Sequence, residues 1–219
     1  MLTREEARKY WQEKQRKANE TMLAHQKYRG ALIEVASMVL EDGLNPNPEF
    51  KARLDAAVEL YHRLCEDYQL VHIYVPGSLH RTGDKSDKCS LSEAGCRYLQ
   101  KRGIPADVLF GNEMNIRYKG EDGVFNSADE CFVTAQIFID GHYKELHCCC
   151  SPIQVTRKWF YYLEFGVEGL IHSVPFAGSD VMDIVTEQLR GVENVIYNDH
   201  SAQRHDSEVW INSRLERKG

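Results

Sequence analysis

Short apolar runs alternate along most of the chain with longer segments in which apolar residues recur every three or four positions. The short runs predict strands and the longer segments predict amphipathic helices. Strands are expected at 31–36, 70–75, 107–110, 146–150 and 169–174. Helices are expected at 48–64, 90–102, 127–140, 152–165 and 179–190. This alternation is typical of a mostly parallel sheet covered on both faces, so the pattern predicts an α/β fold with about five strands.

The two ends of the chain differ from this central part. The highly charged N-terminal stretch predicts a long, mostly solvated helix. We therefore divide the chain into an N-terminal helical extension (1–29), an α/β domain (30–190) and a polar C-terminal tail packing on the domain (191–219). The N-terminal helix is expected to dock either on the domain or on a second copy of the chain, which would form a homodimer. At the start of the domain, residues 31–36 also fit a helix that continues through Leu40.

Helix starts are marked by residues that pair with the free backbone amides of a first turn. Asn47 followed by Pro48 predicts one such cap. Capping boxes place Ser three positions before Glu or Gln, and they are expected at 90–93, 127–130 and 151–154. Ser127 is therefore interpreted as a cap rather than a nucleophile, because no base can be placed beside it from the sequence.

The segment 145–157 carries the most specific prediction of a site. An apolar run ending at Cys150 leads directly into the capping box of Ser151 and Gln154. A strand that runs straight into a helix presents free backbone amides and the positive end of the helix dipole to an anion. Arg157 adds a cation close to that corner. The alternative is an ordinary capped helix with a solvated Arg157.

Further candidate ligand-binding residues follow from the same topology. The loops after parallel strands lie at one edge of the sheet, where ligands bind in α/β folds. Gly77 and Ser78 allow close approach to the backbone, and Glu113 is suited to accept from ribose hydroxyls or an amine, or to act as a base. The residues expected to converge at this edge are Gly77, Ser78, Glu113, Asn126, Ser127, Ser151, Gln154 and Arg157.

Composition and charge narrow the functional classes. The chain has 219 residues and a formal charge of −6, which favours one main domain and argues against general nucleic-acid binding. No apolar run approaches the roughly 18 residues of a membrane-spanning helix, and the first residues lack a signal-peptide apolar region. A cytoplasmic protein without membrane contact is expected. Seven cysteines without C-x-x-C spacing are interpreted as buried free thiols, and no metal site is predicted.

Common enzyme motifs such as G-x-G-x-x-G, the Walker loop, H-E-x-x-H and G-x-S-x-G are absent. Four segments in order instead resemble the YdcF/SanA/ElyC-like family of uncharacterised bacterial domains, namely 53–61, 92–99 with 103–105, 126–130 and 151–157. The resemblance implies a Rossmann-like fold, that is, a three-layer α/β/α arrangement. One cytosolic family member is associated with S-adenosylmethionine binding, whereas membrane-anchored members bear on cell-envelope integrity.

The resemblance also bears on individual residues. Ser151 and Arg157 match the family's Ser and Arg after the corresponding strand. The chain differs from the family at two places. The family usually has His where this chain has Gln154, and Gly-Gly where this chain has Gly77-Ser78. Gln cannot take a proton at neutral pH, so any base chemistry of that His does not carry over.

We therefore expect a soluble Rossmann-like domain that binds a small anionic or nucleotide-type ligand at the carboxyl edge of the sheet, with S-adenosylmethionine as the leading candidate. Two alternatives stay open. One is a phosphoester or pyrophosphate hydrolase, which a metal requirement would favour. The other is a regulatory or scaffold protein that recruits a partner through its N-terminal helix. The sequence does not determine a reaction.

Overall fold

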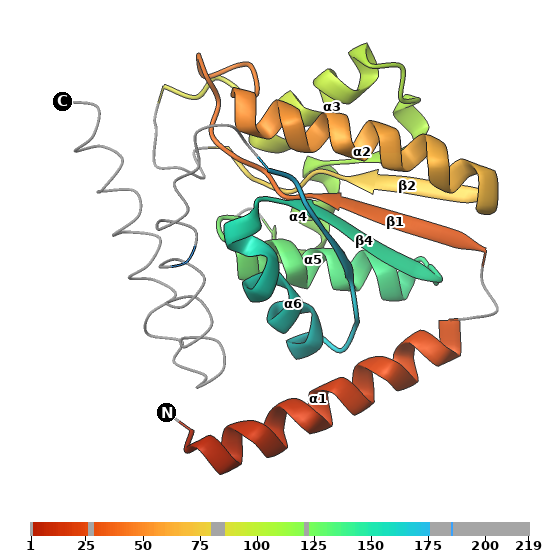
Figure 1. Ribbon diagram of the computed structural model, residues 1–219. Helices are drawn as coiled ribbons and strands as arrows, with labels where there is room; N and C mark the ends of the chain where they lie inside the picture. The colour runs from red at the N-terminus through yellow and green to blue at the C-terminus, as the bar shows by residue number, and fades with distance from the viewer. Residues whose placement is uncertain (1, 26–28, 80–85, 121–122, 176–184, 186–219) are drawn as a thin grey trace.

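The central feature of the molecule is a five-stranded, all-parallel sheet with the order β3-β2-β1-β4-β5 (Figure 1). The structure is a computed structural model that describes residues 2–25, 29–79, 86–120, 123–175 and 185. The strands are β1 (Gly30–Val35), β2 (Leu70–Tyr74), β3 (Leu109–Phe110), β4 (Glu145–Cys150) and β5 (Leu170–Ser173). The expected α/β fold is confirmed, and the alternative of a helix over 31–36 is wrong.

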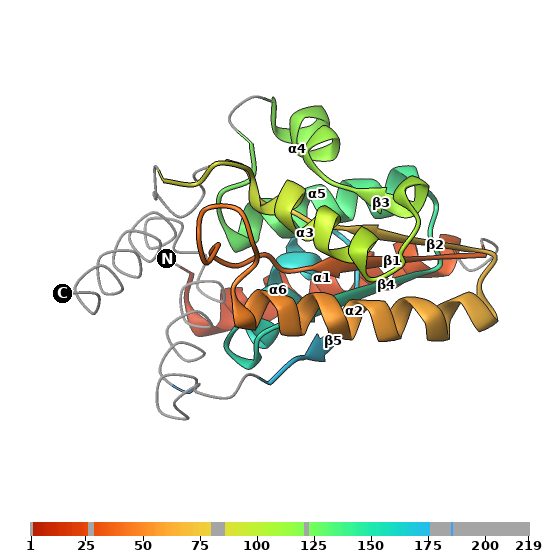
Figure 2. The same ribbon diagram turned by 90° about the horizontal axis from the view of Figure 1, so that it is seen from above.

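Helices cover both faces of the sheet and give the three layers of a Rossmann-like fold. Helices α2 (Pro48–Asp67) and α3 (Leu91–Lys101) lie on one face, whereas α5 (Ser127–Asp140) and α6 (Val155–Glu164) lie on the other (Figures 1 and 2). Successive side chains of a strand point to opposite faces. Ile33 of β1 accordingly packs in the α2/α3 core and Leu32 in the α5/α6 core. Glu34, one position after Ile33, therefore points into the α5/α6 layer.

The helix caps largely follow the sequence signals. The side chain of Asn47 accepts from the Phe50 amide at 2.8 Å, and Ser90 accepts from the Glu93 amide at 3.0 Å. The cap of α5 is one residue earlier than predicted. Asn126 accepts from the Asp129 amide at 2.9 Å, and Ser127 is the first residue of the helix. Asn is among the best N-caps, and the Glu130 carboxylate, the expected second half of the box, is drawn into the core by a buried lysine.

Two predicted segments differ in the structure. Residues 111–123, expected as a loop, contain helix α4 (Asn112–Lys119). Its sequence lacks an amphipathic pattern. The helix is instead attached to β2 by a hydrogen bond that the Tyr74 hydroxyl donates to Asn115 Oδ1 at 2.5 Å. The third strand is also shorter than 107–110, because Ala106–Val108 forms a 3-10 turn before β3. The predicted helix at 179–190 and the tail at 191–219 lie outside the described residues.

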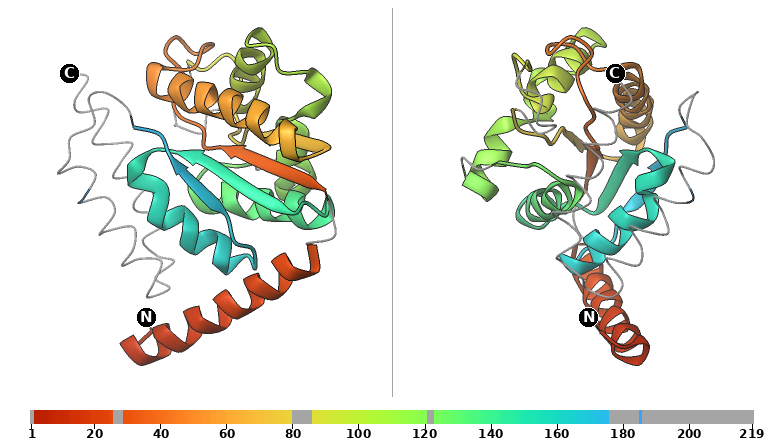
Figure 3. Two further views of the ribbon diagram at one scale, coloured as in Figure 1. Left: turned by 45° about the vertical axis from the view of Figure 1, so that its right-hand side comes forward. Right: turned by 90° about the vertical axis from the view of Figure 1, so that its left-hand side faces the viewer.

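Helix α1 (Arg4–His25) packs against α6 rather than standing free (Figure 3). The ring of Trp11 meets that of Phe160 edge-on at 4.8 Å between centroids. Lys14 Nζ donates to the Glu164 carbonyl oxygen at 3.0 Å, and the Tyr10 hydroxyl donates to the Glu164 carboxylate. One of the two expected docking modes, docking on the domain, is therefore present. A homodimer through this helix stays a prediction.

All seven cysteines carry free thiols in the structure, and five of them are buried. Three consecutive ones, Cys148, Cys149 and Cys150, form the end of β4 and divide between the two cores, as expected for a strand. Among the described helices, none combines the length and the low polarity that crossing a bilayer requires.

Two histidines on neighbouring strands contact each other on the α2-facing side of the sheet. His147 Nδ1 and His172 Nε2 lie 2.9 Å apart with their rings stacked, and the other ring nitrogen of His147 lies 3.1 Å from a Glu145 oxygen. Desolvation lowers the pKa of both imidazoles below the ordinary value of 6.5. The His172 imidazole and the Arg63 guanidinium lower the pKa of His147 further, whereas the Glu145 carboxylate raises it.

This pair predicts a loss of stability at acidic pH. The unfolded chain binds these protons more tightly than the folded protein, so stability is full above pH 6.5 and falls as the pH drops towards the lowered values. Each histidine contributes a slope of at most about 1.4 kcal/mol per pH unit. Urea denaturation at pH 7.5 and 5.5 should therefore show a smaller difference for His147→Gln/His172→Gln than for the parent. Equal differences would mean that the pair does not couple to folding.

Candidate functional site

The strand order defines where a ligand site is expected. From β1 the chain proceeds to β2 and β3 on one side, whereas β4 and β5 lie on the other. The connections after β1 and β4 therefore diverge, and this topological switch point is where open α/β sheets bind ligands. Ala36 and Ser37 follow β1 at this point, and Ser151 follows β4.

A buried arginine joins the two strand ends. Arg53 of α2 is 1% exposed, and its Nη1 donates to the carbonyl oxygens of Ala36 at 2.8 Å and Ser37 at 3.2 Å. Its Nη2 donates to Glu49 Oε1 at 2.5 Å and to the Ser151 hydroxyl oxygen. The Ser151 hydroxyl in turn donates to the same Glu49 oxygen at 2.6 Å. The first helical turn of α2, the end of β1 and the end of β4 are thus held together by one guanidinium.

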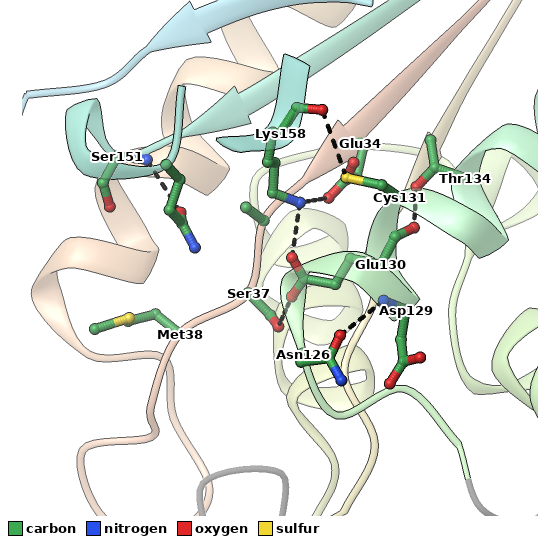
Figure 4. A network of polar contacts seen from close by, with 12 residues as sticks. Glu34, Ser37, Met38, Asn126, Asp129, Glu130, Cys131, Thr134, Ser151 and Lys158 are labelled. Carbon is green, nitrogen blue, oxygen red and sulfur yellow. Dashed lines mark hydrogen bonds and ion pairs between the residues drawn. The ribbon is translucent and has the colours of Figure 1, made fainter. Parts of the chain in front are cut away.

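A second buried cation occupies the other side of the sheet (Figure 4). Lys158 of α6 donates to Glu130 Oε2 of α5 at 2.7 Å and to the carboxylate of Glu34 on β1. The Tyr162 hydroxyl also donates to Glu34, and the Ser37 hydroxyl donates to Glu130 Oε1 at 3.2 Å. Lys158, Glu34, Glu130 and Tyr162 are completely buried. This Lys158 network, as we call these five residues, ends at Ser37 beside the switch point.

The charges of the network stabilise one another. Desolvation alone would lower the pKa of Lys158, but the acidic groups around it, Cys131, Glu130 and Glu34, raise its pKa well above the ordinary value. The carboxylates that Lys158 contacts therefore favour its charged form. Desolvation raises the pKa of the Tyr162 hydroxyl, which keeps its proton and remains a donor to Glu34.

Three of the predicted site residues shape the backbone near the switch point. Gly77 has φ +113, and a Cβ there would lie 2.7 Å from the Ser37 hydroxyl oxygen. The close approach predicted at this glycine is therefore made by the protein itself. The Ser78 hydroxyl accepts from the Val124 amide at 2.7 Å, which ties the loop after β2 to the segment that leads to the Asn126 cap of α5.

Of the remaining predicted residues, Glu113 belongs to the turn that begins α4, whereas Gln154 and Arg157 follow Ser151 after β4. Glu113 accepts from the Gly111 amide at 2.6 Å within its own turn; no described contact joins it to the switch point. Gln154 accepts from the Ser151 amide at 3.4 Å, as the capping box predicts. Arg157 makes no hydrogen bond or ion pair with any described residue, and its Nε is buried without a partner.

Sequence reasoning missed the four charged residues that hold the switch point together, namely Glu34, Arg53, Glu130 and Lys158. A signal existed for two of them. Glu34 interrupts an apolar strand, and Arg53 lies beside Leu54 on the apolar stripe of a helix. A charged residue at a core position is buried only with a partner, so such positions mark a polar network.

The arrangement limits the chemistry that the switch point offers. It presents hydroxyls, backbone amides, an arginine without a described partner, and cations already paired with carboxylates. Among the described residues, no three His, Cys, Asp or Glu side chains are grouped as metal ligands. In comparisons with known proteins, no family model, no curated protein and no solved structure matches the chain.

Proposed function

We propose that the protein binds a small anionic or nucleotide-type ligand at the carboxyl edge of the sheet, between the ends of β1 and β4. The observation that carries this proposal is the strand order, because it places the topological switch point between these two strands. Ser151 and Ser37 lie on its two sides.

Arg157 supports an anionic group on the ligand. It lies in the first turn of α6, where the backbone amides and the helix dipole already favour negative charge. Its buried Nε without a described partner carries an unmet hydrogen-bonding capacity, and buried polar groups are normally satisfied by protein, water or ligand.

S-adenosylmethionine is the first ligand to test, because the resemblance of the four sequence segments to the YdcF/SanA/ElyC-like family suggests it. The amino-acid carboxylate of this molecule suits the arginine and the amides of the first turn of α6. Native mass spectrometry of the protein as purified would detect a retained adenosyl ligand by its mass.

Replacing Arg157 by alanine is expected to weaken binding of such a ligand at least about tenfold, since a hydrogen bond to a charged group contributes about 1.5–3 kcal/mol. Stability should stay within about 1 kcal/mol of the parent, because Arg157 has no described polar partner to lose. Calorimetric titration with S-adenosylmethionine or phosphate and urea denaturation measure the two quantities.

Arg102→Ala is the matched control. Arg102 follows the last turn of α3 and pairs on the surface with Asp55 at 3.1 Å; α3 begins at the carboxyl edge, so its end lies at the opposite edge of the sheet. This variant should bind as the parent does. If Arg157→Ala binds like the parent but unfolds at much lower denaturant, Arg157 is structural and the proposed anion contact is wrong.

A further inference from the structure

The Glu49 carboxylate lies beside two side-chain donors at the switch point, Arg53 and Ser151. One of its oxygens accepts both from Arg53 Nη2 at 2.5 Å and from the Ser151 hydroxyl at 2.6 Å. Glu49 is also in the first turn of α2, where the helix dipole favours a negative charge. The surroundings of this carboxylate are those of a bound anion.

The cation at this position needs a negative partner. Arg53 is 1% exposed, and a buried charge without a counter-charge is strongly disfavoured. The carboxylate does not saturate the guanidinium, because Arg53 Nε is buried without a partner among the described residues. The Arg53–Glu49 pair therefore has a single hydrogen bond, whereas carboxylates and phosphates often bind arginine in a bidentate manner, through two parallel hydrogen bonds.

The three members of the cluster differ in their access to solvent. The Glu49 side chain keeps 13% of its surface exposed, whereas Arg53 and Ser151 are 1% and 3% exposed. Glu49 is thus the member that a change of side-chain rotamer can move outwards. Arg53 is fixed by the carbonyl oxygens of Ala36 and Ser37 and would remain in place.

We propose that Arg53 and Ser151 form an anion-binding site whose internal occupant is the Glu49 carboxylate, and that a ligand bearing a carboxylate or phosphate group binds by displacing it. This inference rests on the proposed function, since it assigns the anionic group of the ligand to the same switch point. It adds that Glu49 competes with the ligand for Arg53 and Ser151. The parent protein therefore binds the ligand more weakly than these two donors would without Glu49.

The test removes the internal carboxylate and supplies small anions instead. Glu49→Gln keeps an oxygen acceptor for Arg53 and Ser151 but loses the charge, and it should bind inorganic phosphate at least about tenfold more tightly than the parent in calorimetric titrations. Glu49→Ala should unfold at lower temperature than the parent in chloride, and its unfolding temperature should rise saturably with acetate or phosphate at constant ionic strength. The parent should show a much smaller rise.

Two controls separate the site from a general salt effect. Glu59→Ala removes the same charge from an exposed position of the same helix and should respond to acetate as the parent does. Glu49→Ala/Ser151→Ala lacks one donor of the site and should lose most of the acetate response. Equal responses of Glu49→Ala and Glu59→Ala would overturn the proposal.

Failure to fold is also informative. If Glu49→Ala stays insoluble at every acetate and phosphate concentration, and Glu49→Gln binds phosphate no better than the parent, the carboxylate is a fixed structural partner and the inference is wrong. The broader function fails separately. A parent that retains no adenosyl ligand and binds neither S-adenosylmethionine nor phosphate in titration would contradict the proposed function even where acetate rescues Glu49→Ala.

Discussion

Lys158→Met is expected to lower the free energy of unfolding by about 3–5 kcal/mol, the usual cost of leaving buried charges without their partner. The substitution keeps a side chain of similar length, so the loss comes from Glu34 and Glu130, whose carboxylates both depend on the Lys158 ammonium. Both are completely buried and cannot turn to solvent. Urea denaturation with linear extrapolation measures the difference.

A surface-pair control and a variant that also lacks the two carboxylates test whether the loss comes from unpaired buried charge. Lys51→Met removes a surface pair with Glu41 at 3.1 Å and should change stability by less than about 1 kcal/mol. Lys158→Met/Glu34→Gln/Glu130→Gln should recover part of the loss, since it removes the unpaired charges as well. A Lys158→Met protein as stable as Lys51→Met would show that the carboxylates take up protons at little cost.

The second large effect is expected from Arg53→Met, with a loss of about 3 kcal/mol or more in the free energy of unfolding. This substitution leaves the Ala36 and Ser37 carbonyl oxygens without their donor and Glu49 without its cation. Arg53→Lys should not restore the parent value, because one ammonium cannot reproduce the planar set of donors that reaches both strand ends.

The contribution of each partner of Arg53 can be separated. In a double-mutant cycle with Glu49→Gln, part of the effect of Arg53→Met should vanish, and the remainder measures the bonds to the two carbonyl oxygens and to the Ser151 hydroxyl. If Arg53→Lys is as stable as the parent, Arg53 contributes only its charge. The interpretation that its several donors hold the ends of β1 and β4 together would then be wrong.

The strands and most helix caps could be predicted because their signals are local. The apolar residues that indicate the strand at 70–75 are consecutive, and the Ser90 side chain caps its helix by accepting from the nearby Glu93 amide. The parallel order then places the ends of all strands at one edge without further information. For this reason the position of the candidate site could be predicted even though its residues were only partly identified.

The features that were missed depend on residues far apart in the chain. Lys158 and Glu34 are separated by 124 positions, and Arg53 and Ser151 by 98. Helix α4 was missed for the same reason, since Asn115 is held by Tyr74, 41 positions away. Ser151 was assigned correctly as the N-cap of a capping box with Gln154. Its hydroxyl, however, is directed to Glu49 of a distant helix, which no local pattern indicates.

The Lys158 network also constrains the order in which the chain can assemble. Its charges come from β1, α5 and α6, and its cation, Lys158, is supplied by α6. If α5 packed on β1 before α6, the carboxylates of Glu34 and Glu130 would be buried without this cation, which is strongly disfavoured, whereas β1 and α6 alone already pair Glu34 with Lys158. We therefore expect α6 to dock on the central strand before α5 or together with it, and α1, which packs on α6, to join after α6.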